Sequence, residues 1–243
     1  MRRPQYTAST VGLDVYVGTL TRYFSRDWKT IVEQAAESTG TPVRVIRANE
    51  PADAIRDPLQ IRPAVIVWRG QLTKALGSNI ASPLDWAEED GRPYFTDKPD
   101  WDGYWALLLL ASYDEKGKAR PKHLMEHPEK DRVLSDAKKT DRYKQILLPV
   151  IWLPAQFDFA FTGPHLTGQQ VTFGSAPRLL DALAELNQRT FKATPEDLDR
   201  WRFEGPTDEK PNPFERTARF ALAVFIQLTE KAVSERLPMI LDY

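Results

Sequence analysis

Two of the three histidines stand in a pattern that could bind a metal ion. His123, Glu126 and His127 follow the H-x-x-E-H order of the inverted zinc-peptidase motif. On a helix, the two imidazoles would share one face and the carboxylate could activate a zinc-bound water. Pro121 and Pro128 flank the motif closely, so a helix through it would have to kink or end. We therefore expect exposed histidines with no bound metal, and we keep a metal-dependent hydrolase as the alternative function.

The segment from Asp100 to Gly103 has the spacing of half a calcium-binding loop. If Gly103 takes the sixth position of such a loop, Lys98 takes the first and Leu109 the twelfth. A calcium loop needs carboxylates at both of those positions. The sequence therefore predicts no calcium site at this segment.

A serine that could act as a nucleophile lies at a predicted strand-to-helix turn. Ser175 follows Phe173 and Gly174, and His165 is the nearest candidate base along the chain. The glycines of a G-x-S-x-G nucleophile turn are missing, however, and no phosphate-binding glycine loop occurs elsewhere. Serine is among the preferred N-cap residues, so we predict that Ser175 caps a helix and assign no catalytic residue and no cofactor.

A basic segment offers a weak case for nucleic-acid binding. Residues 116–144 hold ten lysines and arginines against five acids, although the formal net charge of the chain is −1. Single-stranded nucleic acid is usually bound by such a groove together with several stacking aromatic rings. Tyr143 is present, but no interleaved run of aromatic residues accompanies it. Nucleic-acid binding through this segment is therefore a minor alternative.

The preceding segment is acidic and rich in aromatic residues. Between residues 85 and 102, seven acids oppose Arg92 and Lys98. One interpretation is a surface loop pinned by aromatic packing, with its charges facing water or the neighbouring basic segment. The other is a recognition loop, because exposed tryptophan and tyrosine beside charges are typical anchors of protein interfaces. On the second interpretation, the partner-binding residues are Trp86, Asp97, Asp100, Trp101 and Asp102.

That interpretation predicts a non-catalytic protein-binding module. One specific form is an intracellular immunity protein, or antidote, that occludes a toxin, with the acids steering it onto a basic partner surface. The role requires another protein as partner and involves no membrane. The oligomeric state does not follow from the sequence.

Composition limits the compartment and the chemistry. The 243 residues are 42% hydrophobic and 28% charged and include no cysteine, so disulfides and thiolate metal sites are excluded. The longest apolar runs, such as that from Tyr104 to Ala111, span about eight residues, whereas a membrane helix needs about 20. No apolar stretch of a signal peptide follows Met1 to Arg3. We expect a cytoplasmic protein.

The first half of the chain begins with strand and helix signals. Alternation over residues 11–18 predicts a strand, and Ser25 is expected to cap a helix over 26–39 that ends at Gly40. Residues 42–47 predict a second strand, and the resulting β-α-β unit could be parallel. Residues 64–76 are ambiguous between helix and strand, and helix is favoured. Residues 105–113 predict a buried helix or strand.

The second half gives clearer signals. Residues 145–153 predict an apolar strand, at an edge or with a bulge because of Pro149. Residues 157–161 and 170–173 predict strands, a helix follows Ser175, and residues 195–212 read as a polar connector. Asn212 as cap, Pro213 and Glu215 predict the start of a long buried helix to about residue 236.

These elements predict an α+β fold: a single mixed sheet with packed helices and a long buried C-terminal helix. Residues 1–10 are expected to form a flexible tail, and residues 11–243 a single domain. Residues 77–132 are the candidate for a loop-rich insertion.

Overall fold

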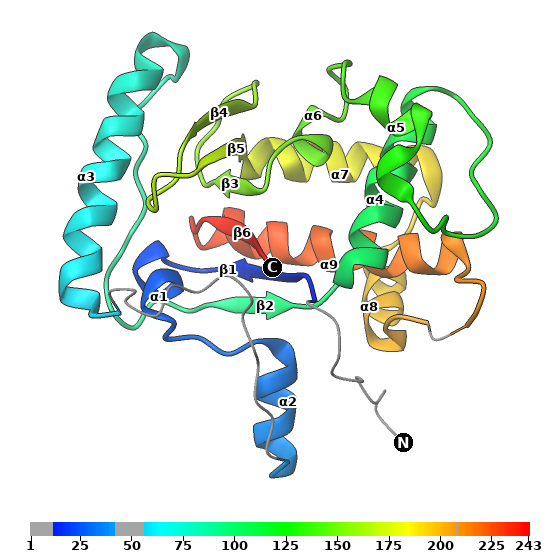
Figure 1. Cartoon of the computed structure of the whole chain (residues 1–243), viewed down its shortest axis with the longest axis horizontal. Helices are drawn as coiled ribbons and strands as arrows, with labels where there is room; N and C mark the ends of the chain where they lie inside the picture. Colours follow the sequence, from blue (N-terminus) through cyan, green and yellow to red (C-terminus); the bar gives the residue numbers. More distant parts are fainter. Residues whose placement is uncertain (1–11, 42–55, 208) are drawn as a thin grey trace.

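A computed structural model describes residues 12–41, 56–207 and 209–243 and contains one six-stranded mixed sheet (Figure 1). The strand order is β2-β1-β6-β3-β5-β4, and only the β3–β5 pair is parallel among these neighbours. This confirms the predicted α+β fold. The strands are β1 (Asp14–Val17), β2 (Phe95–Asp97), β3 (Ile151–Leu153), β4 (Phe161–Pro164), β5 (Gln170–Ser175) and β6 (Met239–Asp242).

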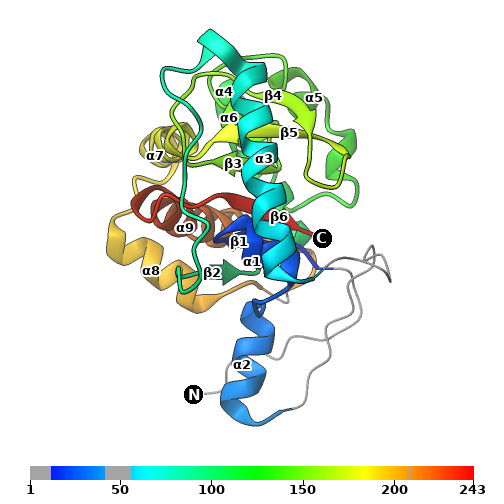
Figure 2. The same ribbon diagram turned by 90° about the vertical axis from the view of Figure 1, so that its left-hand side faces the viewer.

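Helices cover both faces of this sheet (Figures 1 and 2). In the described ranges, no helix is long and apolar enough to cross a lipid bilayer. The helices are α1 (Leu20–Ser25), α2 (Ile31–Thr39), α3 (Pro58–Leu76), α4 (Asp100–Glu115), α5 (Arg132–Ala137), α6 (Lys144–Leu147), α7 (Ala176–Thr190), α8 (Pro195–Glu204) and α9 (Phe214–Ser234).

Strand β1 separates two hydrophobic cores. Its alternation was the reason to predict a strand at 11–18, and all four of its residues are buried. Val15 and Val17 join the core formed with α4, α7 and α9, whereas Tyr16 joins the core formed with α1 and α3. Because side chains alternate along a strand, one central strand can serve both cores.

Helix α9 is the buried helix that the sequence predicts. Its Phe225 is buried, with ring centroids 6.1 Å from Tyr104 and 6.3 Å from Trp152. The predicted capping arrangement is wrong, since Pro213 is the cap residue and no side chain caps the helix. The Asn212 side chain instead bonds to Thr217 and to Asp102.

The first predicted helix is two helices. The chain turns at Arg26, whose φ of 61° is left-handed, so Ser25 ends α1 instead of capping a helix. Thr30 caps α2 in a capping box with Glu33, and Gly40 ends that helix as expected. The predicted strand at 42–47 lies outside the described residues, and both neighbours of β1 pair with it antiparallel.

The ambiguous segment 64–76 is helical, as favoured, but α3 starts earlier. Pro58 occupies its first turn, and Pro63 lies inside the helix. Residues 105–113 belong to α4. The segment 77–132 contributes β2 to the sheet and α4 to the main core, where α4 packs against α9.

Three predictions for the second half are wrong in detail. Residues 145–153 form α6 and then β3. Strand β3 lies between β6 and β5, in the interior of the sheet and not at its edge. Pro149 is compatible with that position because it precedes the strand and leaves the hydrogen bonds of β3 intact. Of residues 157–161, only Phe161 belongs to a strand. The connector 195–212 contains α8, which Thr194 and Asp197 start with a capping box. The short strand β6 had no sequence signal.

Candidate functional site

The five predicted partner-binding residues do not form one surface. Trp86 belongs to the core formed with α1 and α3, whereas the other four lie where β2 ends and α4 begins. Two of the five are buried, so the predicted set divides into residues that hold the fold together and residues that lie at the surface.

Trp86 is a core residue. Its side chain is 3% exposed, and its indole Nε1 donates to Glu88 Oε1 at 2.6 Å. Glu88 in turn accepts from the backbone N–H groups of Leu20 and Thr21 at 3.0 and 2.7 Å. A carboxylate at a helix N-terminus accepts from the free N–H groups there, so Glu88 ties the loop before β2 to α1. Trp86 cannot contact a partner in this conformation.

Asp97 is also buried and acts within a polar network. Its Oδ2 accepts from Arg202 Nε at 2.6 Å, and Arg202 donates to Gln227 at 2.7 Å. Gln227 then donates to Asp199 at 2.7 Å. The network joins β2, α8 and α9, so the Asp97 carboxylate is engaged in holding these three elements together.

The remaining three residues lie in a surface cluster that we call the acidic–aromatic corner. Trp101 is half-buried, and its ring lies edge-to-face against Tyr243 at 5.2 Å and stacks on Trp105 at 6.4 Å. Tyr243 follows β6 and is 53% exposed. The corner consists of Asp100, Trp101, Asp102, Trp105 and Tyr243.

Asp100 has an unusual backbone conformation in the first turn of α4. Its φ of 54° lies in the left-handed region, where aspartate is tolerated better than most residues. Its N–H donates to Leu13 O at 3.2 Å, and its carboxylate pairs with Lys98 Nζ at 3.2 Å. A Cβ at Gly12 would collide with that ammonium group, so glycine there leaves room for the pair.

Burial raises the pKa of Asp100 above its ordinary value, and Lys98 opposes that shift. Asp102 is exposed and accepts from Asn212 Nδ2 at 2.9 Å, while no ion pair involves it in the described part of the chain. The corner thus presents one ion-paired carboxylate and one carboxylate that is oriented but not neutralised. Both flank the Trp101 ring in sequence.

The histidine motif lacks the helix on which the zinc-peptidase motif depends. Residues 123–127 are not helical, and both histidines are exposed, so the shared helix face that the motif requires is missing. His123 forms an isolated bridge with Pro213, and His127 Nδ1 lies 3.3 Å from Glu129. Across the described ranges, no three histidine, aspartate or glutamate side chains are grouped so that they could hold a metal ion.

Ser175 is the predicted N-cap. Its Oγ accepts from the Arg178 N–H at 3.3 Å and donates to Ala155 O at 2.7 Å. His165 bonds instead to Thr167 at 3.0 Å and packs on Phe24, and burial lowers its pKa to about 4. The serine hydroxyl is therefore occupied by structural bonds.

The basic segment 116–144 is partly neutralised by its neighbours. Lys139 pairs with Asp136 at 3.1 Å, and Lys144 with Asp141 at 3.2 Å. The Arg120 guanidinium lies over the Phe191 ring at 5.2 Å. The two ion pairs reduce the positive charge that a polyanion would meet.

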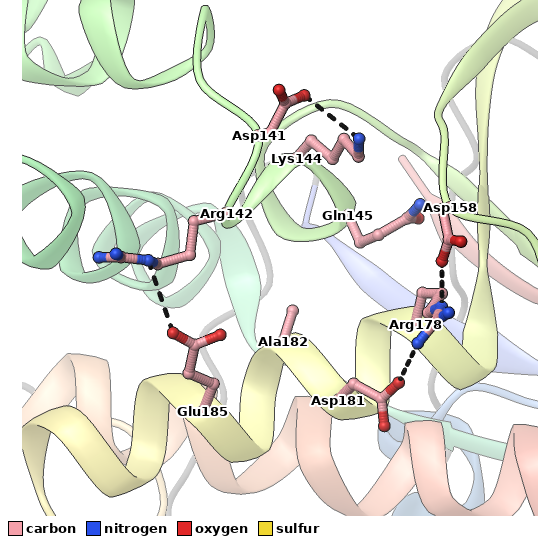
Figure 3. Close-up of a pocket in the computed structure, with 9 residues that line it drawn as sticks. All are labelled: Asp141, Arg142, Lys144, Gln145, Asp158, Arg178, Asp181, Ala182 and Glu185. Atoms are coloured by element: carbon pink, nitrogen blue, oxygen red, sulfur yellow. Dashed lines mark hydrogen bonds and ion pairs between the residues drawn. The ribbon is translucent and has the colours of Figure 1, made fainter.

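A charged depression of about 240 Å³ lies between α6 and α7 (Figure 3). Its cations are each paired with acids: Arg178 with Asp158 and Asp181, and Arg142 with Glu185 at 3.5 Å. Figure 3 shows these pairs lining the opening. A ligand there would have to displace existing ion pairs, and no pattern along the chain predicts the depression.

Comparisons with protein families, with curated proteins and with solved structures find no match.

Proposed function

We propose that this protein is a protein-binding module whose partner docks on the acidic–aromatic corner. The observation that carries the proposal is the Trp101–Tyr243 pair, with ring centroids 5.2 Å apart and Tyr243 53% exposed. Tryptophan and tyrosine dominate the binding energy of many protein interfaces, because they present large rigid surfaces with few rotatable bonds.

The backbone of Asp100 supports the same location. A non-glycine residue at φ 54° is held there by the Leu13 carbonyl and by Lys98, so the first turn of α4 has a fixed geometry. Residues in such sparsely populated conformations cluster at functional sites. A preorganised surface also loses less conformational entropy when a partner binds.

The chemistry of the corner favours a partner with a basic surface. Asp102 is exposed, is oriented by Asn212 and has no cation beside it among the described residues. An arginine or lysine of the partner could pair with it while its neighbours cover Trp101. The specific form of the proposal is an antidote whose corner occludes a basic toxin in the cytoplasm.

Co-purification from the source organism tests the proposal. We expect a tagged chain to recover a basic protein near one-to-one stoichiometry, in an amount that falls as salt is raised. Asp102→Lys should reduce recovery at least tenfold, and the nearly isosteric Asp102→Asn should reduce it less. Circular dichroism should show both variants folded, because Asp102 is exposed.

The control is Phe203→Ala, which removes an exposed aromatic ring from α8, a helix that contributes no residue to the corner. Its recovery should equal that of the wild type. Equal recovery with wild type and Asp102→Lys would contradict the proposed site, and a wild-type chain that recovers no protein would contradict the proposed function.

A further inference from the structure

Helix α3 is apolar on both of its faces. Its inner face packs into the second core through five buried side chains: Ile61, Val65, Trp68, Leu72 and Leu76. On its outer face, Leu59 is 78%, Ile66 46% and Val67 60% exposed. Figure 2 shows α3 lying along the outside of the molecule, in front of the sheet. A surface helix is normally polar on its outer face, so this one is an exception.

The outer residues have the spacing of a helix-pairing seam. Leu59, Pro63, Ile66 and Gly70 follow at intervals of four, three and four residues, which is the period of knobs-into-holes packing. Glycine inside a helix is unfavourable, and a Cβ at Gly70 would meet nothing within 4 Å. Nothing in the described part of the chain therefore requires glycine there. A second backbone approaching closely would require it.

We propose that α3 pairs with α3 of a second copy of this chain, in antiparallel orientation about a two-fold axis near Ile66 and Val67. Such an axis brings Gly70 of each copy over Pro63 of the other. It also brings the exposed Lys74 at one end of the helix toward Leu59 and the exposed Asp57 at the opposite end of its partner. A parallel arrangement would instead place each lysine beside the other.

The charges on α3 fit this self-complementarity. No ion pair of Lys74 is found within the described residues, and Asp57 forms only local bonds that cap the helix there. Arg62 and Arg69, by contrast, are engaged at the side of the helix with Asp90 and Asp85. The outer face thus has a positive charge near one end, Lys74, and a negative charge near the other, Asp57. In an isologous contact, each of these charges meets the opposite one of the second copy.

The size of the contact predicts a weak dimer. A 19-residue helix is roughly 28 Å long, and its exposed apolar patch is on the order of a few hundred Å². Stable complexes bury about 800 Å² on each partner. We therefore expect a monomer–dimer equilibrium in the micromolar range or weaker, and a folded monomer.

Single cysteines test the geometry, because the chain has no cysteine of its own. Near the axis, Ile66→Cys should form a disulfide-linked dimer under mild oxidation. Leu59→Cys alone should not, since the two copies of residue 59 would lie about 22 Å apart, far beyond the 7 Å limit for a disulfide. Mixing Leu59→Cys with Lys74→Cys should give the cross-linked species. Phe203→Cys is the exposed control and should form no disulfide-linked dimer under the same oxidation.

Sedimentation velocity from low-micromolar to near-millimolar protein then measures the equilibrium itself. Ile66→Glu should raise the dissociation constant at least tenfold without changing the circular dichroism spectrum, and Phe203→Glu should leave it unchanged. Cross-linking of Leu59→Cys with itself would overturn the antiparallel arrangement. A wild-type chain that stays monomeric over the whole range, or a dimer that survives Ile66→Glu, would overturn the proposal.

Discussion

The acidic–aromatic corner and the outer face of α3 are both exposed, but they differ in how their surface side chains are held. At the corner, the surface groups are tied into the fold: Trp101 packs on Tyr243 and Trp105, and Asp102 is held by Asn212. On α3, the exposed side chains Leu59 and Val67 are apolar and cover no core. Polar anchoring favours a fixed, specific contact, whereas an unsupported apolar stripe favours weak association with a similar stripe.

The core beneath the corner should give the largest effect. Phe225→Ala in α9 removes a buried ring that contacts Tyr104 and Trp152, so we expect a loss of about 3–5 kcal/mol of unfolding free energy. Val67→Ala on the outer face of α3 should change it by less than about 0.5 kcal/mol. Urea denaturation of both variants measures these changes in unfolding free energy. An unchanged midpoint for Phe225→Ala would contradict the buried position of α9.

The network behind the corner should give the next largest effect. Asp97→Ala leaves Arg202 without its carboxylate, and we expect a loss of about 2 kcal/mol, because a half-buried arginine loses a charge-assisted hydrogen bond. Recovery of the proposed partner, measured on the folded fraction, should be unchanged. A variant that keeps full stability but loses the partner would instead make Asp97 a contact residue.

On α3, Gly70→Ala should raise the free energy of unfolding, whereas the two preceding variants lower it. The new methyl group has open space, so the variant should be more stable by about 0.5–1 kcal/mol at concentrations where the chain is monomeric. The same methyl group should weaken dimerisation. Thermal unfolding of dilute protein and sedimentation of concentrated protein separate the two effects, and a variant that is both more stable and more strongly dimeric would contradict close helix contact at Gly70.

The smallest effect concerns the pH dependence of the corner. The pKa of Asp100 is raised in the folded state by burial, so its protonated form favours the fold. Its stabilising contribution is complete below the unfolded value of 3.8 and is lost as the pH rises through the higher folded value. Asp100→Asn, which also tolerates the left-handed φ, should remove this decrease. Urea titrations of wild type and variant from pH 3 to 7 measure it, and parallel curves would show that burial does not control this carboxyl.

The sequence predicted the fold class because its strongest signals mark elements of the main core. Alternation at β1 and the apolar run of α9 both reflect burial that local spacing reports directly. The break between α1 and α2 was missed because the left-handed turn at Arg26 has no glycine to signal it. Strand β6 is short and pairs only with distant partners, β1 and β3.

The sequence predicted some residues of the candidate sites and missed others. Trp101 and Asp102 were found because acids and aromatics lie together along the chain, but Tyr243 reaches them through the fold. Trp86 looked like an exposed anchor because its partner Glu88, two residues away, is held by the N-terminus of α1, which is far away in sequence. The outer face of α3 was missed because an apolar residue is expected to be buried, and only tertiary packing shows which face stays exposed.

Native mass spectrometry of the protein from its source organism shows whether the chain has a bound protein partner. We expect the wild-type chain to carry a basic second protein in stoichiometric amount. We also expect Asp102→Lys to lose this partner and Ile66→Glu to keep it. A wild-type chain that appears bare, or that holds a metal ion and no partner, would contradict the proposed function, and loss of the partner in Ile66→Glu alone would place its binding site on α3.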